Sequence, residues 1–165
     1  MKPFRRKGDD VVARLDPAEA GIIGLLLDQL EQLLTADADD IGGDPVLARL
    51  LPDGHRGDPE LAADFRELTE SSLRGGKADD LATVRASLPA GGGELRLDAD
   101  QAAAWLRGTN DLRLALGTRL DITEDTEPPE DLASEEGQQL AVYYWLTALQ
   151  GSLVDALAAG RGGRR

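Results

Sequence analysis

Apolar residues recur with the period of an α-helix along residues 98–120, where the pattern is clearest. The stripe consists of Ala102, Trp105, Leu106, Leu112 and Leu116. It predicts an amphipathic helix with one buried face. Asp98 can cap the first turn, and Gln101, three residues later, completes a capping box. Gly108 weakens the interior by about 1 kcal/mol relative to alanine, so it marks either a close helix crossing or a bend.

The dipeptide Asp-Pro opens three further segments with helical spacing. Aspartate caps a helix, and proline suits the first helical position because an N–H there has no partner within the helix. Asp16-Pro17 predicts a helix that ends near Thr35 and carries a wide apolar face. Asp44-Pro45 predicts a short helix that Pro52 stops.

The third Asp-Pro, Asp58-Pro59, predicts a longer helix through Leu73. Gly75 and Gly76 follow it, and paired glycines typically end a helix. A separate helix is then expected over residues 79–88. A site for a metal or a nucleophile does not emerge from these segments, and no catalytic residue is assigned.

The last predicted helix covers residues 134–159, and it is apolar nearly all round. Such a helix is buried on all sides. Either it lies at the centre of a bundle, or its outer side forms a subunit interface, in which case residues 140–157 make a homodimer. An acidic, proline-containing linker, residues 121–131, precedes it.

Two stretches alternate in the manner of strands. Residues 3–16 predict a β-hairpin that turns at Gly8-Asp9-Asp10. Residues 94–97 form a third short strand that can pair with it. The expected fold is therefore mainly α: a single-domain helical bundle over residues 1–159 with a small N-terminal β-hairpin, followed by a basic, disordered tail at 160–165.

The amino-acid composition excludes several kinds of catalytic, metal-binding and redox-sensing site. The chain has no cysteine, so thiolate catalysis, thiolate metal ligation and a thiol switch are excluded. Its one histidine, His55, lies in a polar loop and is expected to be an ordinary surface residue. We expect no cofactor and no enzyme activity. No segment reaches the roughly 18 apolar residues of a membrane span, and no signal peptide is recognised, so a cytoplasmic location is expected.

Charge divides the chain unevenly. The net charge is −13, and residues 17–160 hold 10 basic and 28 acidic residues. Such a body repels nucleic-acid phosphates, so DNA is disfavoured as a partner and a basic protein is favoured. Direct DNA binding would have to use the basic ends. A nucleic-acid arm at the N-terminus would consist of Lys2, Arg5, Arg6 and Lys7.

The helix over residues 98–120 also carries polar residues that packing alone does not require. Asp111 and Arg113 are two positions apart, so they cannot face each other on one helix and are expected to bond to neighbouring elements. These residues are either a structural hydrogen-bond network or a partner-binding site. The candidate partner-binding residues are Trp105, Asn110, Asp111, Arg113 and Arg119.

Three stretches together resemble one protein family over nearly the whole chain. They are DPAEAGIIGLLLDQLEQLL, DPVLARLLPDGHRGDPELAADFRELTESSLR and, most specific, LDADQAAAWLRGTNDLRLALGTRLDI. The sequence resembles the actinobacterial domain-of-unknown-function family usually encoded beside the ClpS adaptor, whose members have been named oxidative-stress transcriptional regulators (AosR).

The resemblance implies a non-enzymatic regulator that acts by protein–protein contact with the transcription machinery, a sigma factor or an RNA polymerase component. Where that role rests on an oxidisable cysteine pair, this chain departs, since it has none. Either a partner relays the redox signal, or this member has lost direct sensing, or the family's shared role is something else. Two alternatives stay open. One is a direct DNA-binding regulator that uses the basic termini, and the other is an adaptor linked to ClpS/Clp proteolysis.

Overall fold

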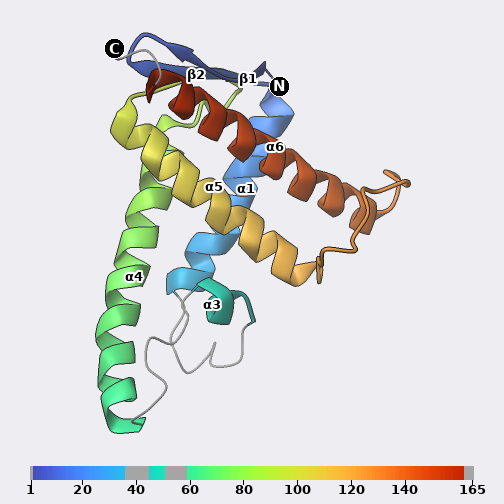
Figure 1. Cartoon of the computed structure of the whole chain (residues 1–165). Helices are drawn as coiled ribbons and strands as arrows, with labels where there is room; N and C mark the ends of the chain where they lie inside the picture. Colours follow the sequence, from blue (N-terminus) through green and yellow to red (C-terminus); the bar gives the residue numbers. More distant parts are fainter. Residues whose placement is uncertain (1, 36–44, 51–58, 162–165) are drawn as a thin grey trace.

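A small antiparallel sheet closes one end of the molecule (Figure 1). The computed structural model describes residues 2–35, 45–50 and 59–161. Strands β1 (Lys2–Lys7), β2 (Asp10–Leu15) and β3 (Gly93–Leu97) lie in the order β1-β2-β3. Gly8, at a φ of 66°, makes the turn of the hairpin, since positive φ costs glycine nothing. The predicted hairpin and third strand are confirmed.

The Asp-Pro signals locate two helix starts correctly. Helix α1 (Pro17–Thr35) begins after Asp16, whose carboxylate accepts from the Glu19 N–H at 2.7 Å. The Glu19 side chain accepts from the Asp16 N–H in return, which completes the capping box. Helix α3 (Pro45–Leu50) is the short helix expected next. His55 falls outside the described residues, and so do the side chains of residues 59–71.

Helix α4 (Pro59–Ser87) corrects the sequence prediction. One continuous helix replaces the two that were expected on either side of Gly75 and Gly76. Glycine weakens a helix without blocking it, because it keeps its N–H and adds no steric clash. Long-range contacts flank the pair: Arg74 donates to the Leu34 carbonyl at 2.8 Å, and Lys77 binds Asp111 of the next helix. Tertiary contacts therefore override the local stop signal.

Helix α5 (Ala99–Arg119) is the predicted central helix, and Asp98 and Gln101 form its capping box. It packs against α1, α3, α4, β2 and β3, and along the last helix, α6 (Glu135–Arg161). A Cβ at Gly108 would lie 3.0 Å from Val84 Cγ2, so the glycine allows α5 to cross α4 closely. Of the two alternatives that the sequence left open at Gly108, a close crossing or a bend, the structure shows the close crossing.

Helix α6 lies over α5 and β1 with one side against the core (Figure 1). The buried side presents Leu146, Leu149 and Leu153. Val154, on the outer side, is 47% exposed. The expectation that α6 is buried on all sides is therefore wrong for the described part of the chain, in which no residue covers Val154 fully.

One hydrophobic cluster runs from the inner face of the sheet through α1, α4, α5 and α6. Its largest fully buried members include Trp105, Leu15, Ile23, Leu27 and Leu81. Burial of such side chains contributes about 1.5–3 kcal/mol each. Among the described helices, none combines the length and hydropathy needed to cross a membrane.

The continuity of α4 makes a prediction about its two glycines. An added Cβ would meet nothing within 4 Å at Gly75 or Gly76. We expect Gly75→Ala and Gly76→Ala each to raise the free energy of unfolding by about 0.8 kcal/mol, measured by urea denaturation. Gly108→Ala is the control, and it should destabilise because its Cβ would press on Val84. No gain at either exposed glycine would indicate that the helix breaks there.

Candidate partner-binding surfaces

Trp105 belongs to the core. Its side chain is 1% exposed, and its Nε1 donates to Ser87 Oγ at 2.7 Å. Its ring meets Phe4 of β1 edge-on at a centroid distance of 6.3 Å. This packing ties the hairpin to α5. A partner therefore cannot contact Trp105 unless the sheet moves.

Asp111 is a buried carboxylate held by α4. Lys77 Nζ lies 3.0 Å and 3.1 Å from its two oxygens. Burial raises the pKa of Asp111, and the hydrogen bond and charge of Lys77 oppose that rise. The pair therefore links α4 to α5, and it confirms the expectation that Asp111 bonds to a neighbouring element.

Asn110 and Arg113 face α6 instead. Asn110 Oδ1 accepts from Arg113 Nη2 at 3.2 Å and from Gln150 Nε2 at 3.3 Å. The Arg113 guanidinium lies 6.0 Å from the centre of the Tyr143 ring, within the range of a cation–π contact. Arg113 Nε is buried and finds no hydrogen-bond acceptor among the described residues.

A pocket of about 480 Å³ adjoins this junction. Arg49 of α3 and Arg113 line it together with Thr118, Asp121 and Tyr143. The pocket is open, and its two arginines make it suited to a small anion or to a carboxylate side chain.

Arg119 lies at a different place, at the end of α5. Its Nη1 donates to Gln29 Oε1 of α1 at 3.2 Å. There it borders a larger groove of about 700 Å³ between α1 and the start of α6. Apolar side chains form most of that groove: Ile22, Leu25, Leu26, Leu116, Leu132 and Val142. Of the five predicted partner-binding residues, Arg119 alone lines this groove.

Leu25 and Leu132 were missed by the sequence analysis. They are 58% and 60% exposed, the two highest values among the exposed large hydrophobic residues of the described chain. A signal for Leu25 was present, because the apolar face of residues 17–35 is wider than one contact surface requires. Leu132 gave no signal, since it is an isolated apolar residue in a polar linker.

The predicted nucleic-acid arm is a strand of the sheet. Lys2, Arg5 and Lys7 are exposed. Arg6 is engaged: its Nε donates to the Gly8 carbonyl at 2.9 Å, and its guanidinium lies against Gly160 of α6, where an added Cβ would collide with it. Three of the four basic side chains of this predicted arm are therefore exposed to solvent, and they lie on a strand of the sheet.

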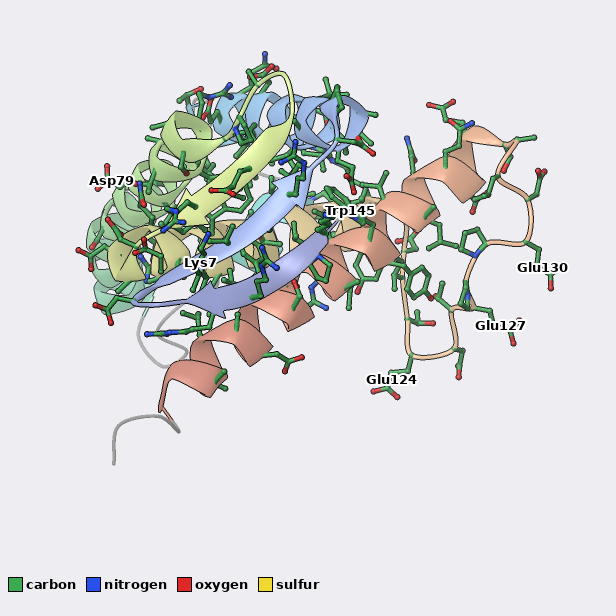
Figure 2. All side chains as sticks on the ribbon, turned by 90° about the horizontal axis from the view of Figure 1, so that it is seen from above. Lys7, Asp79, Glu124, Glu127, Glu130 and Trp145 are labelled. Atoms are coloured by element: carbon green, nitrogen blue, oxygen red, sulfur yellow. The ribbon has the colours of Figure 1, made fainter. Side chains whose placement is uncertain are left out.

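The sheet gathers further cations on its outer face, which Figure 2 views from above, with Lys7 at the hairpin end. Lys2 pairs in register with Arg14, and Arg5 lies opposite Val12, which in turn lies opposite Arg96. Arg96 binds Asp10 at 3.2 Å. Lys2, Arg5, Lys7 and Arg14 make no ion pair with any other described residue. This basic sheet face contrasts with the acidic remainder of the chain.

The five candidate residues on α5 thus point in different directions and do not form one site. Within the described ranges, no three His, Asp or Glu side chains gather as a metal ion would need. What the geometry offers is two contact surfaces, the apolar groove beside α1 and the basic sheet face, together with the arginine pocket.

Comparisons with known proteins agree on one family. A family model described as "Domain of unknown function (DUF2017)" matches residues 1–157. The chain is 36% identical over 134 residues to "Oxidative stress regulator AosR" of Mycobacterium tuberculosis and of Mycobacterium bovis, which covers 72% of this chain and 61% of each relative. It therefore spans about three fifths of the length of these relatives.

A second relative is matched over more of its length. The chain is 35% identical over 175 residues to "Putative oxidative stress regulator AosR" of Mycobacterium leprae, which covers 90% of this chain and 79% of the relative. No solved structure matches the chain.

The Lys77–Asp111 pair makes a pH-dependent prediction. Lys77→Met leaves a buried carboxylate without its cation and should lower the free energy of unfolding by about 3 kcal/mol at pH 7. Lys77 holds down the raised pKa of Asp111, so this pKa rises further in the variant. The loss is therefore full above the variant's pKa, shrinks as the pH falls through it, and vanishes where the carboxyl is protonated in both folded proteins.

Urea denaturation between pH 3 and pH 7 checks this. Arg107→Met is the matched control, because Arg107 binds Asp80 at 2.8 Å but is itself 61% exposed. The control should cost about 0.5 kcal/mol. If the stability lost in Lys77→Met does not change with pH, the loss does not come from leaving the Asp111 carboxylate without its charged partner.

Proposed function

The chain belongs to the DUF2017 family, and on that premise we propose that it is a non-enzymatic regulator of the oxidative-stress response. In this proposal it acts by protein–protein contact with the transcription machinery, through a sigma factor or an RNA polymerase component, and it works in the cytoplasm. The observation that carries the proposal is its similarity to relatives named oxidative stress regulators, over 90% of this chain in the M. leprae protein.

Charge and surface support contact with a protein. Residues 17–160 hold 28 acidic and 10 basic residues. DNA-binding components of the transcription machinery are basic on their working surfaces, and complementary charge speeds and orients association. The exposed leucines of the groove beside α1 add an apolar surface of the kind that protein partners cover.

The absence of cysteine constrains the mechanism. Reversible redox sensing by side chains uses cysteine thiolates or methionine, and the chain has no cysteine and no methionine beyond Met1. In the proposed function the redox signal therefore reaches this chain through its partner. The chain contributes the binding surface, and the partner's oxidation state sets how much complex forms.

A second candidate function, direct DNA binding, is favoured by one observation, the unpaired cations of the basic sheet face. Phosphate contacts by lysine and arginine dominate nucleic-acid affinity. The acidic remainder of the chain opposes such binding. An adaptor role in Clp proteolysis is a third candidate, and it predicts a protease chaperone as partner.

The regulator proposal is tested by affinity capture of the tagged chain from its own cells, with and without peroxide, read by mass spectrometry. We expect a sigma factor or polymerase subunit to be recovered, and peroxide to change the amount. Recovery of Clp components in its place would favour the adaptor role. Recovery of the chain alone would count against both.

If the chain binds DNA directly, it should bind duplex DNA at low salt and release it as the salt concentration rises. Truncating residues 2–7 would not test this, because they form β1 and its removal would expose the core. Arg5→Glu with Arg14→Glu keeps the strands and reverses two phosphate-binding charges. This double variant should abolish retention in a gel-shift assay, while Arg119→Glu, on the far side of α5, should leave it unchanged. Equal retention by both variants would exclude the sheet face.

A further inference from the structure

We propose that the groove between α1 and the start of α6 docks one amphipathic helix of a partner protein, with leucine-like anchors and lysine or arginine on its flanks. This inference rests on the proposed function, since it assigns a place and a chemistry to the protein contact. It does not depend on which protein supplies the helix.

The floor of the groove is apolar and open. Leu25 of α1 and Leu132, just before α6, stand on opposite sides and are each more than half exposed. Ile22, Leu26 and Val142 continue the surface between them. An amphipathic helix laid into a hydrophobic groove covers such a surface with residues at positions i, i+3, i+4 and i+7. The groove volume of about 700 Å³ is large enough for several anchoring side chains.

Leu132 is held in place although its side chain is exposed. Its carbonyl accepts from Gln138 Nε2 at 3.0 Å. Ser134 Oγ donates to the Asp131 carbonyl at 3.3 Å and accepts from the Gly137 N–H at 3.0 Å. Gly137 is required, because a Cβ there would collide with the Asp131 carbonyl oxygen. An apolar residue fixed in this way reduces the entropy lost on binding, as expected of a preformed anchor.

The rim of the groove sets the charge of the occupant. Residues 121–136 contain eight acidic residues and no basic one. In Figure 2, Glu124, Glu127 and Glu130 project outward from the linker, away from the helices. Of the eight, Glu135 lines the groove and makes no ion pair with any other described residue, whereas Asp121 lines the arginine pocket. Arg119 is the cation that lines the groove, and it donates to Gln29. A helix with basic flanks therefore meets the Glu135 carboxylate at the groove, on a chain whose net charge is −13.

A second copy of the chain fits this surface less well. Pairing two grooves face to face would bring the two Glu135 carboxylates toward each other, on chains that each carry a net charge of −13. Like charges placed opposite each other at an interface oppose association. The charge argument therefore favours a basic partner helix over a homodimer at this place.

The test uses the whole chain and a synthetic peptide of about 18 residues, long enough for a stable helix once bound. The peptide carries leucine at the anchoring positions and lysine elsewhere. A scrambled peptide of the same composition controls for charge alone, and a version with glutamate in place of lysine controls for hydrophobicity alone. Fluorescence anisotropy of labelled peptide reports affinity, and circular dichroism confirms that each variant folds.

We expect the leucine–lysine peptide to bind at least about tenfold more tightly than either control, and to weaken as salt rises. Leu25→Asp should weaken it about tenfold or more. Val154→Asp is the matched control, because Val154 is 47% exposed on α6 but does not line the groove, and it should change nothing. Equal affinity for the scrambled peptide, or no effect of Leu25→Asp, would overturn the proposal.

A second pair of variants tests the positioning of Leu132. Gly137→Ala should displace residues 131–134 and weaken peptide binding with Leu25 intact. Gly151→Ala, on the same helix with nothing within 4 Å of the added Cβ, should not. If sedimentation shows a dimer that Leu25→Asp dissociates, the groove belongs to a second copy and the proposal is wrong.

The two proposals fail separately. If the peptide binds as expected but no transcription component is captured, the groove is a helix-binding site and the regulator proposal is rejected. Capture that persists in Leu25→Asp would keep the regulator proposal and move the contact elsewhere.

Discussion

The rest of the structure depends on α5, because it is the element that nearly every other one packs against. It lies against α1, α3, α4 and α6 and against two strands. The close crossing with α4 needs Gly108, and the attachment of the hairpin needs Trp105. The Lys77–Asp111 pair fixes the register of that crossing with a buried charge. A helix so fully used for packing has little surface left for a partner.

This use of α5 explains where the contact surfaces lie. Asp111 bonds to α4 and Asn110 bonds to α6, so the polar residues that distinguish α5 serve the fold. The surfaces left open belong to elements at the edge: the outer face of the sheet, and the side of α1 that α6 approaches only at its first turns. Residues 121–131 connect α5 to α6, and Leu132, which follows them, lines that opening.

Local signals were predictable and long-range ones were not. The Asp-Pro starts, the Asp98–Gln101 capping box and the Gly8 turn are determined by residues within four positions of one another, and each was predicted correctly. The continuity of α4 through Gly75 and Gly76 depends on contacts with Leu34 and Asp111, which no local pattern contains. The groove could not be predicted, because whether Leu25 and Leu132 are covered depends on how far α6 reaches.

The absence of thiols and the fixed position of Leu132 lead to the same view of how regulation would work. A ligand shifts an equilibrium only by its differential affinity for the two states involved. This chain has no cysteine to change its own state under oxidation, and its groove anchor is held by hydrogen bonds before any partner arrives. Under the proposed function a thiol-based change of state therefore belongs to the partner. Oxidation would expose or fold a basic helix there, and the groove would select that form without changing shape.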